Sequence, residues 1–122
     1  MNTQPWSDLG TEEYCYLTTT GRVTGRPHTI EIWFAAVGDT VYLLAGGGDD
    51  ADWVRNLRAN ADVSLRIADV EYHAAARIVT DPDEARTARQ LLYDKYNPGS
   101  NGDLASWRDT ALPVAIDRQD AE

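Results

Sequence analysis

Residues 14–45 decide the fold, and they read YCYLTTTGRVTGRPHTIEIWFAAVGDTVYLLA. Three segments of this stretch are rich in aromatic and β-branched residues, as is typical of β-strands: Tyr14–Thr20, His28–Ala36 and Thr40–Ala45. Turn signals separate them, because Gly21–Pro27 contains two glycines and Gly38-Asp39 suits a tight hairpin. The stretch therefore predicts three consecutive antiparallel strands.

The rest of the chain predicts three more strands and two principal helices. The further alternating segments are Val63–Ile67, Val70–Val79 and Leu112–Ile116. Helices are expected over Asp49–Asn60 and from Pro82 to about Tyr96, with Asp81 as the N-cap and Glu84 completing a capping box. Six short antiparallel strands in so small a chain favour a closed or nearly closed β-barrel with helices at its ends, because closure removes exposed strand edges.

Composition narrows the class of protein. The 122 residues are enough for one domain, residues 1–122, and the net charge of −9 makes a nucleic-acid partner unexpected. No apolar run approaches the ~20 residues of a membrane span, and the N-terminus lacks the features of a signal peptide. Cys15 is the single cysteine, which excludes an internal disulfide and fits a cytoplasmic location.

Several catalytic patterns are missing from the sequence. It contains no Cys-x-x-Cys and no His-x-x-x-His, so no metal site is expected. It also lacks Gly-x-Ser-x-Gly, Gly-x-Gly-x-x-Gly and the P-loop pattern. An enzyme with so little acid–base equipment often relies on a cofactor for the difficult chemical step.

The loop Gly21–Arg26 carries Arg22, Thr24 and Arg26 between two predicted strands. Guanidinium groups, a hydroxyl and backbone N–H groups made accessible by glycine are the donors that bind phosphate or carboxylate. In a chain with this surplus of acids, two arginines in one short loop indicate an anion-binding clamp. A solvated hairpin is the alternative.

A second loop, Gly46-Gly47-Gly48, leads into a predicted helix. Glycines let the backbone approach a ligand closely, and a helix N-terminus offers N–H donors to a phosphate. Three aspartates would repel a phosphate there unless nearby arginines offset their charge. These aspartates are Asp49, Asp50 and Asp52, and the arginines are Arg55 and Arg58. A flexible connector is the alternative.

Three segments resemble a single family. Residues 17–27, LTTTGRVTGRP, look like the Thr-Gly-Arg-x-Ser/Thr-Gly-x-Pro segment of the deazaflavin (F420)-dependent nitroreductase family. Residues 53–60, WVRNLRAN, resemble that family's Trp-x-x-Asn-Leu-x-Ala-Asn helix, and residues 107–114 are similar to its C-terminal strand entry. The resemblance covers residues 16–116, nearly the whole chain.

The resemblance implies a split β-barrel of the pyridoxamine 5′-phosphate oxidase-like superfamily, here with six strands. It implies an oxidoreductase that transfers hydride from reduced F420, a riboflavin-like ring with a phosphate and an oligoglutamate tail. The acceptor would be a small electrophile such as a nitro compound, a quinone or an enone.

The resemblance also implies a set of cofactor-binding positions. Those expected to line the phosphate or tail are Arg22, Thr24, Gly25 and Arg26. Those expected to pass beside the ring through backbone groups are Ala45, Gly46, Gly47 and Gly48. Trp53 and Asn56 would hold their helix over the cofactor.

Two positions depart from the family pattern. Val23 stands where members often carry Lys, and residues 46–49 read GGGD where members often have Ser-Lys-Gly-Gly. Fewer cations weaken the hold on an anionic tail. FMN is therefore kept as the alternative cofactor, and a non-catalytic carrier of a cofactor or ligand as the alternative function.

Tyr96 is the candidate proton donor, and closing its helix against the barrel is the alternative role. The expected partner is a small-molecule substrate, with no nucleic acid and no membrane span. The sequence leaves both a monomer and a homodimer open.

Overall fold

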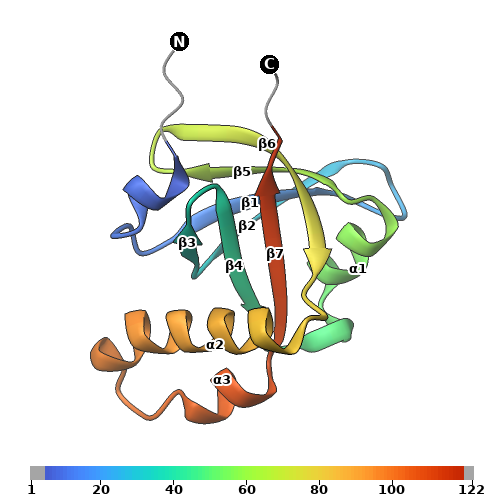
Figure 1. The fold of residues 1–122 in the computed structure, drawn as a ribbon. Helices are drawn as coiled ribbons and strands as arrows, with labels where there is room; N and C mark the ends of the chain where they lie inside the picture. Colours follow the sequence, from blue (N-terminus) through green and yellow to red (C-terminus); the bar gives the residue numbers. More distant parts are fainter. Residues whose placement is uncertain (1–4, 120–122) are drawn as a thin grey trace.

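The computed structural model of the protein describes residues 5–119 and shows an antiparallel sheet curled into a half-barrel with flanking helices (Figure 1). The sheet has seven strands in the order β2-β1-β5-β6-β7-β4-β3. Their bounds are β1 Cys15–Thr20, β2 Pro27–Ile32, β3 Ala35–Val37, β4 Thr40–Ala45, β5 Asp62–Ile67, β6 Val70–Ile78 and β7 Leu112–Arg118. The predicted fold class, a mainly β split barrel, is confirmed.

The helices lie along the barrel's lower end and one side (Figure 1). They are α1 Asp52–Ala59, α2 Pro82–Tyr96 and α3 Ala105–Thr110, with short 3-10 turns η1 Trp6–Leu9, η2 Gly48–Asp50 and η3 Asn97–Gly99. The start of α2 is as predicted, because the Asp81 carboxylate accepts a hydrogen bond from the Glu84 backbone N–H at 2.9 Å. No helix among residues 5–119 is long and apolar enough to cross a membrane.

The predicted strand His28–Ala36 is wrong in one respect: it is two strands in opposite parts of the sheet. β2 pairs with β1, whereas β3 pairs with β4, and the chain changes partner at Trp33 and Phe34. The Phe34 backbone N–H donates to the Tyr96 hydroxyl at 3.0 Å, and its carbonyl accepts from Lys95 Nζ at 2.9 Å. These bonds replace the strand ladder at Phe34, so the sheet has seven strands instead of six.

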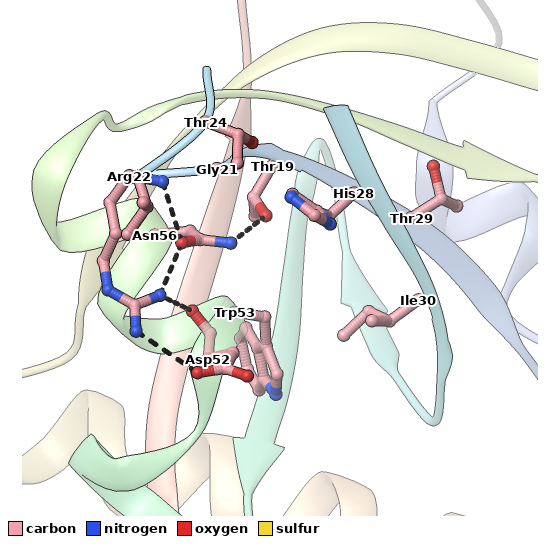
Figure 2. A pocket seen from close by; sticks show the side chains of 11 residues that line it. Thr19, Gly21, Arg22, Thr24, His28, Thr29, Ile30, Asp52, Trp53 and Asn56 are labelled. Atoms are coloured by element: carbon pink, nitrogen blue, oxygen red, sulfur yellow. Dashed lines mark hydrogen bonds and ion pairs between the residues drawn. The ribbon is translucent and has the colours of Figure 1, made fainter. Parts of the chain in front are cut away.

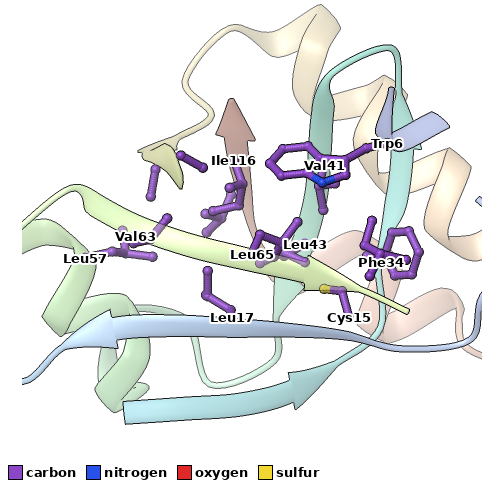
Figure 3. Packing of buried hydrophobic residues seen from close by; sticks show 14 residues of the cluster. Trp6, Cys15, Leu17, Phe34, Val41, Leu43, Leu57, Val63, Leu65 and Ile116 are labelled. Carbon is purple, nitrogen blue, oxygen red and sulfur yellow. The ribbon is translucent and has the colours of Figure 1, made fainter. Parts of the chain in front are cut away.

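The main core fills the inside of the half-barrel (Figure 3). Alternate residues of β1, Cys15 and Leu17, point inward, and they meet Leu65 of β5 and Leu43 of β4. A second cluster forms where α2 covers the other face of β4 and β7. β4 is therefore buried on both faces, which explains its continuous apolar sequence.

Helix α1 begins three residues later than predicted. The residues before it, Gly48–Asp50, form the 3-10 turn η2, and Gly48 has the positive φ of 59° that favours glycine. Along α1, the buried side chains are Val54, Asn56 and Leu57. This helix packs beside β1 and so sets one wall of the candidate site.

Candidate functional site

The loop between β1 and β2 has a tight backbone that favours glycine at position 25 and a small residue at position 21. Gly21 N donates to the Arg26 carbonyl, and Gly25 N donates to the Gly21 carbonyl, each at 2.8 Å. Gly25 has φ +76°, and a Cβ added at Gly21 would lie 2.6 Å from His28 Nε2. The Thr24 hydroxyl accepts from Arg26 N at 3.2 Å, so it stabilises the loop itself.

Asn56 holds this loop against α1. Its side chain is buried, with 5% of the residue exposed, and its Oδ1 accepts from Arg22 N at 3.2 Å and from Arg22 Nη1 at 2.8 Å. Its Nδ2 donates to the Thr19 hydroxyl at 3.2 Å. Both ends of the amide are therefore satisfied within the protein, and Asn56 positions the Arg22 guanidinium without having to touch a ligand.

Arg22 stands at the edge of a cavity of about 460 Å³ (Figure 2). The guanidinium and Asn56 form one side, whereas His28 and Ile30 of the β2 segment face them from the other. Trp53, which is half-buried, supplies an aromatic surface between the two sides. The cavity thus combines a fixed cation with an apolar wall.

The acids near this cavity are paired with arginines. Asp49 accepts from Arg58 Nη2 at 2.6 Å, and Asp50 from Arg55 Nη2 at 3.3 Å. The predicted offset of these carboxylates by Arg55 and Arg58 is present in the structure. Asp52 pairs with Arg22 instead, at 3.3 Å, which sequence spacing did not reveal because 30 residues separate the two.

A second cavity of about 500 Å³ lies further along β2 and is mainly aromatic and aliphatic. Its lining residues are Tyr14, Glu31, Ile32, Trp33, Leu44, Leu104 and Trp107. The Trp33 ring packs edge-on against Trp107, with centroids 5.6 Å apart. The two tryptophans, in edge-to-face contact, give this cavity an aromatic wall.

The two cavities are neighbours along one strand. Ile30 lines the first and Ile32 the second, and residues two apart on a strand share a face at a spacing of about 7 Å. Together they offer a charged end at Arg22 and an aromatic end at Trp33 and Trp107. The aromatic end was missed from the sequence, where nothing distinguishes a tryptophan in the core from one that lines a cavity.

The structure brings some predicted positions together and not others. Arg22, Thr24, Trp53 and Asn56 all line the first cavity. Gly25 and Arg26 belong to the same loop and lie outside that lining within the described chain. Ala45 is buried in β4 opposite Leu112, and Gly46, Gly47 and Gly48 line neither cavity within residues 5–119. A Cβ at Gly46 would lie 3.8 Å from Trp107, so this glycine loop borders the aromatic end.

Tyr96 lies beneath the aromatic end and is only 7% exposed. Its hydroxyl accepts from Phe34 N at 3.0 Å and donates to the Glu13 carbonyl at 2.7 Å, and its ring stacks on Trp33 at 4.3 Å. Burial raises the pKa of the Tyr96 hydroxyl. These contacts hold α2 against the barrel; the role of proton donor stays a prediction.

Lys95 is the neighbouring cation on α2. Its ammonium lies 3.7 Å from the centroid of the Phe34 ring, and burial lowers its pKa to about 8.

Within residues 5–119, no three His, Cys, Asp or Glu side chains converge in a way that suits a metal ion.

Comparison with known proteins identifies sequences similar to this chain. The family described as F420H(2)-dependent quinone reductase matches residues 6–119 of the chain. The F420H(2)-dependent quinone reductase Rv1261c of Mycobacterium tuberculosis is 36% identical over 105 residues, which cover 82% of this chain and 69% of that protein.

Two solved structures illustrate the fold. One is named F420-H2 Dependent Reductase (FDR-A); it has a TM-score of 0.70 and 22% identity, covering 87% of this chain and 94% of that one. The other is a Listeria innocua protein named for pyridoxamine 5′-phosphate oxidase. It has a TM-score of 0.69 and 16% identity, covering 92% of this chain and 88% of that one.

Proposed function

The chain belongs to the F420H(2)-dependent quinone reductase family, and from this premise we propose that it transfers hydride from reduced F420 to a quinone. The observation that carries the proposal is the Arg22 cation at one end of two neighbouring cavities and the aromatic wall of Trp33 and Trp107 at the other. That arrangement suits a coenzyme whose anionic side chain lies at Arg22 and whose ring meets a planar acceptor at the aromatic end.

The residues present fit F420. Each cavity lies within the ~300–1,000 Å³ typical of small-molecule sites. Arg22 would bind the phosphate, because a guanidinium offers paired N–H donors to its oxygens. Thr24, Gly25 and Arg26 would follow the tail from the same loop, and Trp53 would pack against the cofactor from α1.

The glycine loop would serve the ring. Gly46 lies next to Trp107, and the backbone of Ala45 and Gly46-Gly47-Gly48 would accompany the ring edge from there. Family membership favours F420 over FMN at this position.

Bound F420 supplies the hydride, so the protein's own residues have to orient the acceptor and shield the transfer from water. Trp33 and Trp107 would hold the planar acceptor against the ring, and a fixed geometry removes much of the entropic barrier to transfer. Leu44 and Leu104 would exclude water from the transfer path. Reduction of a quinone to a quinol also takes up one proton, for which Tyr96 remains the predicted donor.

The test is steady-state oxidation of F420H2 with a small quinone such as menadione, followed through the absorbance of oxidised F420. We expect quinone-dependent turnover by the wild type and saturable F420 binding in a fluorescence titration. Binding without turnover would favour the alternative of a non-catalytic carrier. No binding at tens of micromolar F420, with FMN bound instead, would refute the cofactor assignment.

We also propose a cytoplasmic location and allow for a homodimer. The buried free thiol of Cys15 is consistent with a reducing compartment. Light scattering of the purified protein at several concentrations would determine whether it is a monomer or a dimer.

A further inference from the structure

The cation of the clamp is already engaged by a carboxylate of the protein. Arg22 Nη2 lies 3.3 Å from Asp52 Oδ1, while Nη1 donates to Asn56 Oδ1 at 2.8 Å and approaches the Asp52 carbonyl at 3.5 Å (Figure 2). Asp52 is also among the residues that line the first cavity. An anion that reaches Arg22 from the cavity therefore meets this carboxylate.

The two partners of Arg22 differ in how easily they can be displaced. Asn56 is buried and fixed at both ends of its amide, so it stays in place. The Asp52 side chain is 85% exposed, against 30% for that of Arg22, so rotation about its Cα–Cβ bond takes it into water. The position occupied by Asp52 is thus the one that an incoming anion can take.

Resting on the proposed function, we propose that Asp52 competes with the cofactor's phosphate for Arg22. The phosphate displaces the Asp52 carboxylate on binding, so Asp52 sets how strongly the protein prefers F420 to the phosphate-free ring. The competing pair is electrically balanced. Among the described residues that line the cavity, Arg22 is the one arginine or lysine and Asp52 the one acid. Replacing Asp52 by asparagine leaves a net positive charge at the cavity.

The neighbouring acids provide a matched comparison. Asp50 precedes the same helix and is also paired with an arginine, Arg55 at 3.3 Å, but it does not line the first cavity. The variant D50N removes the same charge from nearly the same place in the chain without freeing Arg22. It therefore reports the general effect of a less acidic surface.

The experiment measures the dissociation constants of F420 and of its phosphate-free deazariboflavin fragment by fluorescence, for wild type, D52N and D50N at low ionic strength. Exposed ion pairs contribute little, so we expect D52N to tighten F420 binding by roughly two- to fivefold and to leave the fragment unchanged. D50N should change neither by a comparable factor. Because salt screens exposed charges, the gain should shrink at about 0.5 M salt.

A double-mutant cycle with R22Q distinguishes competition by Asp52 for Arg22 from simple charge repulsion between Asp52 and the phosphate. If Asp52 acts by occupying Arg22, D52N gives no gain in the R22Q background. A gain that persists there, an equal gain in D50N, or unchanged or weaker F420 binding by D52N would overturn the proposal. The proposed function is tested separately on the wild type, because it fails if the wild type does not bind F420 or does not oxidise F420H2 with a quinone.

Discussion

Replacing Asn56 by alanine should both destabilise the protein and weaken its binding of F420. The amide makes three hydrogen bonds, two accepted from Arg22 and one donated to Thr19. A hydrogen bond contributes about 1 kcal/mol on average, and the bond to the guanidinium is worth somewhat more. Water can replace part of the contact at Arg22, so we expect the free energy of unfolding to fall by about 2–3 kcal/mol.

The weaker binding of F420 follows because the Arg22 guanidinium is no longer held in position. Without Asn56, the Arg22 side chain keeps only the exposed Asp52 as a partner and samples more rotamers, so binding has to immobilise it again. Immobilising a long side chain costs about 0.5–1.5 kcal/mol, which corresponds to a rise in the F420 dissociation constant of roughly two- to twelvefold.

Guanidinium denaturation and fluorescence titration measure the two effects independently. The matched control is T19V, which removes the hydroxyl bonded to Asn56 and leaves both bonds to Arg22. We expect T19V to lose about 1 kcal/mol of stability and little F420 affinity. If N56A binds F420 as tightly as the wild type, or if T19V weakens binding as much as N56A does, the positioning of Arg22 by Asn56 is not what matters.

Three further predictions concern the aromatic end and the helix that supports it. W107A should raise the KM for a quinone about tenfold, by loss of an aromatic contact, while the F420 dissociation constant measured without acceptor stays near the wild-type value. Y96F should lower the free energy of unfolding by about 1–3 kcal/mol, because Phe34 N loses its buried acceptor. In the same variant, a fall in kcat of ~100-fold or more would support the role of Tyr96 as proton donor, and an unchanged kcat would exclude it. Hydrogen bonds from Arg77 and Tyr42 lower the pKa of Glu84 from 4.5 to about 2, so the stability they supply is complete above pH 4.5 and is lost as the pH falls towards 2. Acid unfolding of E84Q should therefore depend less on pH over that window than unfolding of the wild type, and equal dependence would show that another group is responsible.

Local sequence determined most of the secondary structure. In a strand with one buried face, apolar and polar residues alternate, and a few residues are enough to show this pattern. The start of α2 is likewise indicated by four consecutive residues, Asp81 to Glu84. The segments that resemble the family are likewise short and contiguous. They were sufficient for the split barrel and for F420-dependent reduction, because the family is recognised from local motifs in the right order.

The tertiary structure alone decided where strands end and which side chains meet. The break after Ile32 depends on Tyr96 and Lys95, more than sixty residues away, which take the backbone bonds of Phe34. The clamp likewise depends on Asn56, 34 residues from Arg22. No local pattern carries such contacts, because they arise only when the curled sheet brings distant segments together.

The same reason explains the candidate site. Arg22 was predicted from its motif, but its engagement by Asp52 follows from how α1 packs beside β1. The aromatic wall likewise follows from the contact between Trp33, after β2, and Trp107 of α3. Residue type indicates what a side chain can bind, and only its packed surroundings decide whether it faces a cavity, a partner or the core.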